Sequence, residues 1–376
     1  MKLNPNSLSQ ILARRILNYG AISLHEFMSE ALNHPEYGYY TKSNPIGRSG
    51  DFITAPEISQ MFGELIGVWC ASTWIKIGKP NSFALMELGP GRGTLIVDAL
   101  RALKALPECL KALELHFVEI NPQLKKSQEK LLSDYRVIWH KSLDDIPQKP
   151  TIFIANEFFD ALPIEQLFFR NKKWYRRKVD LADKKYKSEP KFTFTEEVSS
   201  LSDLDRQFVV DSKCLNGSVF EFSPDSRDAI TKISKHINYY NGAALIVDYG
   251  YHEPNTNSTL QAIQRHRYVD VLNEPGCSDL TAHVDFRALS SVAIINGVSC
   301  WWPISQGSFL RRLGIETRSE KLSVSASDAT KESIKRAKQR LINEDQMGTL
   351  FKVMVLGQKS SYPFPGFLSN ELSETA

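Results

Sequence analysis

The order of hydrophobic and polar residues predicts helices at the start of the chain. Hydrophobic residues recur at helical spacing in residues 7–19, 23–32 and 59–77, and the first two segments begin with a serine, a good helix N-cap. Between the second and third, residues 33–59 are rich in Pro, Gly, Tyr and Asn, which predicts an ordered loop.

After Pro80 short apolar runs begin to alternate with helical patterns. Strands are predicted at 83–88, 113–119, 136–139, 151–155, 243–248 and 350–356, and helices at 94–106, 122–132, 309–313 and 329–342. Such alternation is typical of a mostly parallel sheet with helices on both faces. We therefore predict an α/β fold.

Residues 166–222 break this alternation. Their apolar and polar residues alternate, which predicts antiparallel strands, interpreted as an insertion at the edge of the main sheet. We predict a helical cap and lid over residues 1–80, then a main domain over 81–376. That domain carries the β-rich insertion at about 166–222 and a second insertion of helices and loops at about 252–345.

Composition excludes several classes of protein. The 376 residues are 42% hydrophobic and 24% charged, as in ordinary globular proteins, and the net charge of +3 gives no reason to expect a nucleic-acid partner. The five cysteines form no CxxC pair, which fits a reducing compartment, and neither an H-E-x-x-H nor a G-x-S-x-G motif is present. We predict no metal site, and no apolar run is long enough for membrane insertion.

The run "ELGPGRGT" follows the strand predicted at 83–88 and indicates a cofactor site. Its pattern is E-x-G-x-G-x-G, formed by Glu87, Gly89, Gly91 and Gly93, whereas a dinucleotide fingerprint would place its third glycine where Thr94 stands. The spacing is typical of S-adenosylmethionine (SAM) sites in class I methyltransferases, which have a Rossmann-like fold. The glycines and Pro90 would pass under the cofactor, with Glu87 facing its ammonium group. A nicotinamide or flavin dinucleotide, and a glycine turn in an unrelated α/β fold, are the alternatives.

Two further positions extend this site. Glu119 ends the next predicted strand, where a carboxylate accepts both ribose hydroxyls, although dinucleotide enzymes place an acid similarly. The adenine is expected near residues 140–145, beside Ser142 and Leu143.

Polar residues also follow the strand at 151–155. Asn156, Glu157 and Asp160 leave its carboxyl end, where substrates of open α/β sheets bind. Their alternative role is structural, with Asn156 capping a helix. The strand at 243–248 delivers Asp248 and Tyr249 to the same edge.

Two more segments are polar in ways that a plain core does not need. One contains Asp51 and Glu57, and the other contains Asp279, His283 and Asp285. Each has a structural alternative, since Asp285 could cap a helix and His283 could be an ordinary loop histidine.

Eight blocks in order resemble the MidA family of SAM-dependent methyltransferases. They span residues 50–356 and are "GDFITAPEISQMFGE", "ELGPGRGTL", "NEFFDALPIEQ", "VDYGY", "TLQAIQRH", "PGCSDLTAHVDF", "QGSFLRRLGI" and "MGTLFKVMVL". The resemblance implies a class I SAM-methyltransferase fold, SAM as cofactor and S-adenosylhomocysteine as product. Mitochondrial members are protein arginine methyltransferases that act on the 49-kDa-type core subunit of respiratory complex I and assist its assembly.

The resemblance implies a protein substrate, which we expect to be that subunit. The start of the chain lacks the pattern of a signal peptide or presequence, so we expect a cytoplasmic bacterial member, or the mitochondrial matrix if the source is eukaryotic. The sequence does not determine the oligomeric state, and a homodimer is one of the states considered. The alternatives are a SAM-binding assembly chaperone and a methyltransferase with a small-molecule substrate.

The same reaction suggests catalytic residues. A carboxylate pair can bind a guanidinium in bidentate fashion and orient one nitrogen. Glu157 and Asp160 are the first candidates, with Asn156 beside them and Asp51, Glu57 and His283 next. The basic run at 170–178 is interpreted as a solvated hairpin face in preference to a docking surface.

Overall fold

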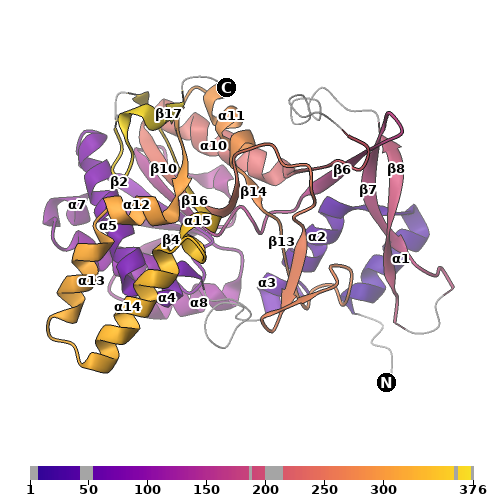
Figure 1. Cartoon of the computed structure of the whole chain (residues 1–376), viewed down its shortest axis with the longest axis horizontal. Helices are drawn as coiled ribbons and strands as arrows, with labels where there is room; N and C mark the ends of the chain where they lie inside the picture. Colours follow the sequence, from indigo (N-terminus) through magenta and orange to yellow (C-terminus); the bar gives the residue numbers. More distant parts are fainter. Residues whose placement is uncertain (1–6, 43–53, 186–188, 200–214, 360–362, 374–376) are drawn as a thin grey trace.

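The main sheet is mixed and mostly parallel. The structure is a computed structural model that describes residues 7–42, 54–185, 189–199, 215–359 and 363–373. The strand order is β17-β15-β16-β10-β5-β2-β3-β4, with β14 beside β10 (Figure 1). The strands are β2 (Phe83–Leu88), β3 (Leu113–Val118), β4 (Val137–His140), β5 (Thr151–Asn156), β10 (Gly242–Tyr251), β14 (Val284–Asp285), β15 (Ser299–Ser305), β16 (Phe351–Gly357) and β17 (Leu372–Ser373).

Strands β10, β5, β2, β3 and β4 run parallel, so their carboxyl ends share one edge of the sheet. Strand β16 pairs antiparallel with β10, and β15 with β16. The α/β fold predicted from the sequence is confirmed, and the shared edge brings the polar residues that follow each strand together.

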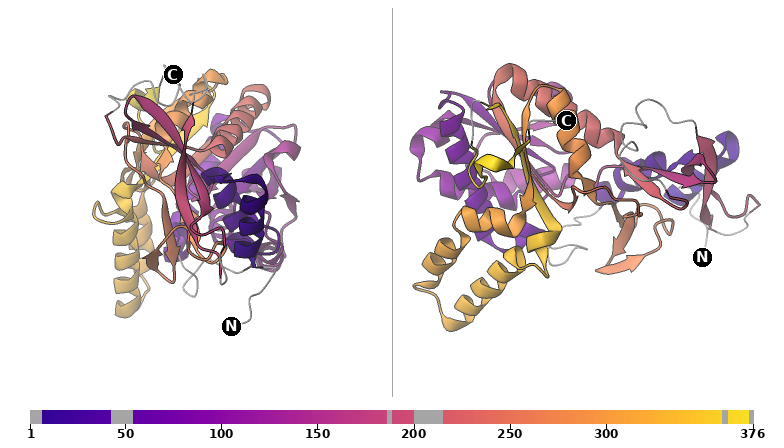
Figure 2. Two further views of the ribbon diagram at one scale, coloured as in Figure 1. Left: turned by 90° about the vertical axis from the view of Figure 1, so that its right-hand side faces the viewer. Right: turned by 45° about the horizontal axis from the view of Figure 1, so that its top comes forward.

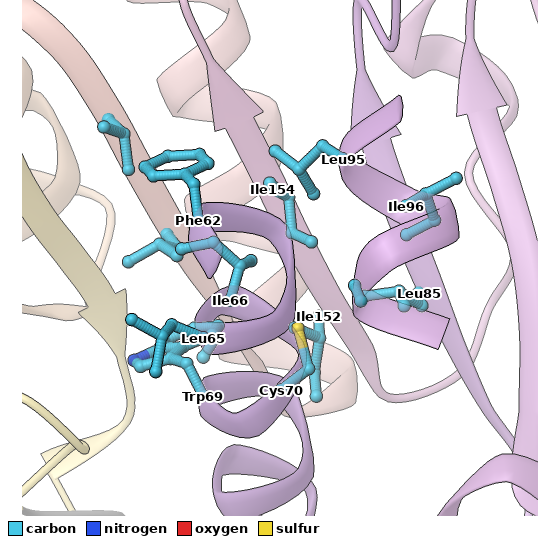
Figure 3. Packing of buried hydrophobic residues seen from close by; sticks show 14 of the residues in the cluster. Phe62, Leu65, Ile66, Trp69, Cys70, Leu85, Leu95, Ile96, Ile152 and Ile154 are labelled. Carbon is cyan, nitrogen blue, oxygen red and sulfur yellow. The ribbon is translucent and has the colours of Figure 1, made fainter. Parts of the chain in front are cut away.

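Helices cover both faces of this sheet because its strands are apolar on both sides. They are α5 (Gln60–Lys76), α6 (Thr94–Leu103), α7 (Pro107–Ala112), α8 (Pro122–Leu131), α10 (Pro224–Tyr240), α11 (Phe286–Ile295), α12 (Gln306–Arg312), α13 (Ile315–Ser323), α14 (Asp328–Ile342) and α15 (Met347–Leu350). Residues of α5, α6, α12 and α14 form one hydrophobic layer, and residues of α10 and α11 form the other. Figure 3 shows α5 and α6 side chains extending toward β2 and β5.

A second lobe lies beside the main sheet (Figure 2). It contains a separate antiparallel sheet of β1 (Ile22–Ser23), β6 (Glu165–Arg170), β7 (Lys173–Leu181), β8 (Phe192–Ser199) and β9 (Val219–Phe222). Helices α1 (Leu8–Tyr19) and α2 (Leu24–Asn33) share a hydrophobic cluster with β7. The small sheet β11 (Gln261–Gln264), β12 (Arg267–Val269) and β13 (Asp279–Thr281) contributes to the same cluster.

This lobe corrects one prediction. The antiparallel strands were expected at the edge of the main sheet, yet they pair with β1 from the N-terminal segment and form their own sheet. Ile22 and Ser23 supply only two residues, too few to show a strand pattern in the sequence. The domain boundary after residue 80 stays a prediction, and α5 packs into the main core while α1 and α2 belong to the second lobe.

The loop predicted at 33–59 contains two short helices in its described part, α3 (Tyr39–Lys42) and α4 (Ala55–Ile58). The serine caps predicted at Ser7 and Ser23 are confirmed, because each accepts a hydrogen bond from a backbone N–H of the helix that follows. Ser59 caps α5 in the same way. Among the described helices, none is both long and apolar enough to cross a lipid bilayer.

Helices α5 and α6 approach closely at two glycines. A Cβ on Gly67 would lie 2.4 Å from the Ala99 carbonyl oxygen, and one on Gly63 would lie 2.6 Å from the Asp98 Cβ. The contact matters for function because α6 begins at the glycine loop.

We predict that Gly67→Ala destabilises the protein by about 1–3 kcal/mol, because overpacking outweighs the roughly 1 kcal/mol that alanine normally adds to a helix. Urea unfolding would measure the change. Val68→Ala on the exposed side of α5 is the control, with an expected change within about 0.5 kcal/mol. A Gly67→Ala protein as stable as the wild type would contradict this packing.

Candidate functional site

The glycine loop connects β2 to α6 in a backbone conformation that glycine adopts easily. Gly89, Gly91 and Gly93 have φ of 60°, 55° and 82°, where other L residues are strained. A Cβ on Gly89 would lie 3.2 Å from the Phe158 ring. A side chain at this position would therefore press against Phe158, and glycine leaves the backbone accessible to the two cavities that Gly89 and Gly91 line.

Glu87 lies at the carboxyl end of β2, just before this loop. It is 3% exposed, and its Oε2 has no hydrogen-bond partner among the residues that the structure describes. Burial, and then the nearby Glu119, raise the pKa of Glu87 well above its usual range. An arriving cation such as an ammonium group would offset this cost.

Glu119 follows β3, and its orientation is fixed by neighbours. Its Oε1 accepts a hydrogen bond from the Asn121 N–H at 2.7 Å, and its Oε2 accepts one from Gln128 Nε2 at 3.0 Å. Burial raises the pKa of Glu119. The carboxylate thus sits at a strand end, ready for further donors such as ribose hydroxyls.

Gln128 of α8 connects the glycine loop with Glu119, and no motif in the sequence indicated this role. Its side chain is fully buried, and its Nε2 also donates to the Gly91 carbonyl at 2.7 Å. Its Oε1 accepts from Trp139 Nε1 at 2.9 Å. In the sequence, Gln128 shows only as a glutamine on the same helix face as Leu124 and Leu131. Such a pattern is common in helices and does not indicate a binding site.

A cavity of about 360 Å³ extends along the carboxyl ends of the parallel strands. That volume lies in the range of small-molecule sites, about 300–1,000 Å³. The residues that line it include Gly89, Gly91, Glu119, Ser142, Leu143, Glu157, Asp160 and Tyr249. A smaller cavity shares Gly89, Gly91 and Glu157 with it and is also lined by Glu87, Pro90, Thr94 and Asn156.

Glu157 stands where β5 leaves the sheet. It is a non-glycine residue with φ of 51°, and its Oε1 accepts hydrogen bonds from Ala55 N–H at 3.1 Å and Asn156 Nδ2 at 3.2 Å. Burial and the neighbouring Asp160 raise its pKa to about 7. No helix follows Asn156, so its alternative role as a helix cap is wrong.

Asp160 is 6% exposed, and within the described part of the chain its Oδ1 has no hydrogen-bond partner. Burial raises its pKa to about 6, and a hydrogen bond with Tyr249 opposes that rise. The turn that carries it is held by Asp248 Oδ2, which accepts from the N–H groups of Phe159 at 3.0 Å and Asp160 at 3.3 Å. These two hydrogen bonds therefore fix the position of Asp160 relative to Asp248.

The remaining candidates lie elsewhere. Asp51 is outside the described residues. His283 lines a separate cavity of about 40 Å³, and its ring contacts that of Tyr249 at 5.4 Å between centroids. Asp285 caps α11 through the Ala288 N–H, which confirms its structural alternative.

Glu57 of α4 contacts the glycine loop. One of its oxygens accepts from Thr94 Oγ1 at 2.5 Å, and the other lies 3.4 Å from Arg92 Nη1. Since Ala55 of the same helix donates to Glu157, α4 joins the glycine loop to the carboxyl pair.

The basic run of β7 faces acids of β8. Lys178 Nζ lies 2.9 Å from Glu197, and Arg170, just before β7, lies 2.8 Å from Glu196. The Arg177 guanidinium stacks over the Phe168 ring at 4.1 Å. These contacts favour the interpretation as a hairpin face. No group of three or more potential metal ligands occurs among the described residues.

A protein-family model matches residues 65–304, and its family is described as "Putative S-adenosyl-L-methionine-dependent methyltransferase". The chain belongs to this family. It is 36% identical to the mitochondrial protein arginine methyltransferase NDUFAF7 homolog of Drosophila melanogaster, over 98% of this chain and 87% of that protein. It is 32% identical to the mitochondrial protein arginine methyltransferase NDUFAF7 of Homo sapiens, over 92% of this chain and 82% of that one.

Solved structures agree with the family. A Burkholderia thailandensis protein crystallised with S-adenosylhomocysteine matches with a TM-score of 0.84 and 26% identity, covering 98% of this chain and 95% of that chain. The chain is thus a SAM-dependent methyltransferase with the class I fold. The site fits this cofactor, because Glu87 Oε2 is a buried oxygen with no hydrogen-bond partner in the described part of the chain and Gly89 and Gly91 line the two cavities. Glu87, the glycine loop and Glu119 could hold its ammonium, methionine and ribose portions.

We predict that Gln128→Leu weakens SAM binding about tenfold or more, since it leaves the Gly91 carbonyl and the Glu119 carboxylate without their shared donor. Isothermal titration calorimetry measures the dissociation constant, and the thermal midpoint checks folding. Gln123→Leu on the exposed side of α8 is the matched control and should bind as the wild type does. Unchanged affinity in a folded Gln128→Leu protein would contradict the linking role of this amide.

Proposed function

We propose that this protein transfers a methyl group from SAM to an arginine nitrogen of a protein, the 49-kDa-type core subunit of complex I, and so aids assembly of the complex. The observation that carries the proposal is a pair of carboxyls, the buried Asp160 and the half-buried Glu157, in the cavity that the glycine loop lines. The names of the relatives, protein arginine methyltransferases, support the guanidinium as acceptor. The expected compartment is the bacterial cytoplasm, or the mitochondrial matrix in a eukaryote.

The carboxyl pair suits a guanidinium because that group stays protonated, with a pKa above about 12. A carboxylate can hold it through two parallel N–H hydrogen bonds and orient one nitrogen. When bound, SAM supplies an electrophilic methyl group on a sulfonium. Glu157 and Asp160 then draw positive charge from the guanidinium and raise the nucleophilicity of the nitrogen that faces the methyl. Positioning of this kind accounts for much of the rate in many enzymes.

The same residues handle the proton. The guanidinium nitrogen gains a carbon–nitrogen bond as the carbon–sulfur bond breaks, and it then loses one proton. Glu157, with its pKa raised to about 7, is a stronger base than an ordinary carboxylate and accepts that proton. The product arginine keeps a single positive charge, and the proton passes from Glu157 to solvent before the next turnover.

The proposal is tested by transfer of radiolabelled methyl from SAM. The substrates are the purified 49-kDa-type subunit from the same source and a lysate depleted of this protein. Label in that subunit, recovered as methylarginine after hydrolysis, is the expected result. Label confined to small molecules would contradict the proposal, and so would an absence of label with intact SAM binding, the result expected of an assembly chaperone.

We predict that Glu157→Gln lowers turnover by about two orders of magnitude or more, the effect of losing one preorganised charged group. Its SAM affinity should change little, because the amide can still accept from Ala55 N–H. Steady-state kinetics and calorimetry give both values. Glu253→Gln, an exposed change of the same type, is the control. Wild-type turnover by Glu157→Gln would contradict its role.

We predict that kcat/KM rises with pH from about 5.5 to about 7.5, because both carboxyls must be ionised to bind the guanidinium. Their pKa values of about 7 and about 6 place the rise in that window. A pH–rate profile measures it, and Glu157→Gln should remove the part near pH 7. A rate that is flat or falls with pH over this range would be inconsistent with ionised carboxyls.

A further inference from the structure

A carboxyl from the second lobe also lines the large cavity. Asp279 lies on β13, is 6% exposed, and accepts a hydrogen bond from the Tyr40 hydroxyl at 2.8 Å. Tyr40 belongs to α3 and lines the same cavity. The two residues are 239 positions apart in the chain, so the fold alone brings them together.

The segment that carries Asp279 is hydrogen-bonded to the backbone of Asp160. The Ala282 N–H donates to the backbone oxygen of Asp160 at 3.1 Å. Two residues on, β14 pairs in parallel with the end of β10, where Gly250 faces Val284. A Cβ on Gly250 would lie 2.1 Å from the Val284 carbonyl oxygen, so this glycine permits the close approach. The position of Asp279 relative to Asp160 is therefore fixed by backbone contacts.

Tyr40 is held in place through its backbone. Its carbonyl oxygen accepts from Asn121 Nδ2, and the Asn121 N–H donates to Glu119. Burial raises the pKa of the Tyr40 hydroxyl well above its usual range, and the charges of Asp279 and Asp160 add to the rise, so both carboxyls lie near this phenol. Tyr40 thus connects the Glu119 loop with the Asp279 side chain.

The cations that line the cavity do not neutralise all of its carboxyls. The lysines in its lining are Lys141 and Lys232, and Lys232 Nζ is paired with Asp144 at 2.6 Å and Asp228 at 2.7 Å. Asp160 Oδ1, by contrast, is a buried oxygen with no hydrogen-bond partner among the described residues. Asp160 and Asp279, carboxyls from the two lobes, therefore suit a cationic group that offers more than one donor pair.

A guanidinium is such a group. It presents five N–H donors in a plane, so two carboxylates can each take a pair from different edges, and the methyl can still approach a terminal nitrogen from above the plane. An ammonium has three donors on one atom, and the methyl must approach that atom. A second carboxylate in fixed position therefore distinguishes arginine from lysine.

We propose that Asp279, oriented by Tyr40, binds the side of the substrate guanidinium that Glu157 and Asp160 leave open, and that it makes the site selective for arginine over lysine. This proposal rests on the proposed function. It adds a binding residue from the second lobe, so the site is completed only by the contact between the lobes.

The test compares Asp279→Asn and Tyr40→Phe with the wild type on two peptides. One contains the arginine identified by the labelling experiment, and the other has lysine in its place. Asp279→Asn should raise KM for the arginine peptide about 10- to 100-fold, the size of one charged hydrogen-bonded pair, with a smaller loss in kcat. Its preference for arginine over lysine in kcat/KM should fall by a similar factor. Tyr40→Phe should change both values in the same direction but less.

The control is Asp270→Asn, which removes the same charge from an exposed position in the same insertion. SAM affinity measured in parallel shows whether each variant is folded. A folded Asp279→Asn or Tyr40→Phe protein with wild-type KM and wild-type preference would overturn the inference. A wild-type enzyme that labels neither peptide would instead overturn the proposed function.

Discussion

The structure depends on one constraint, which is the complete or partial burial of carboxyl groups near the carboxyl ends of parallel strands. Glu87 lies near the end of β2 and Asp248 in the last part of β10, Glu119 follows β3, and Glu157 and Asp160 follow β5. Burying an ionised carboxylate without a partner costs several kcal/mol, so these groups take up protons more readily than usual. A bound cation offsets this cost, and the cofactor and the proposed substrate are both cations.

Neighbouring elements keep these carboxyls in place. Asp248 holds the turn of Asp160, Gln128 links the glycine loop to Glu119, and α4 connects that loop with Glu157. The second lobe adds Tyr40 and Asp279 from its own side of the cavity. Glu157 has a positive φ at this junction, and strain of this type is frequent at active sites. Residues of both lobes therefore line the cavity.

The sequence predicts the part of the site that depends on local pattern. A strand followed by E-x-G-x-G-x-G locates the cofactor loop, and Glu119 and Glu157 follow from the rule that parallel strands end at one edge. It does not predict contacts between distant segments. Gln128 looks like any helix glutamine, the Tyr40–Asp279 pair spans most of the chain, and β1 is too short for periodicity to reveal. His283 was a candidate of second rank, and the fold places it in another cavity.

The central claim is that one cavity holds the cofactor and an arginine between carboxyls of both lobes. A crystal structure with S-adenosylhomocysteine and an arginine peptide tests it most directly. The account predicts the guanidinium within hydrogen-bond distance of Glu157 or Asp160 on one side and of Asp279 on the other, with one nitrogen facing the sulfur. A guanidinium bound outside this cavity, or a cofactor away from Gly89 and Glu119, would contradict it.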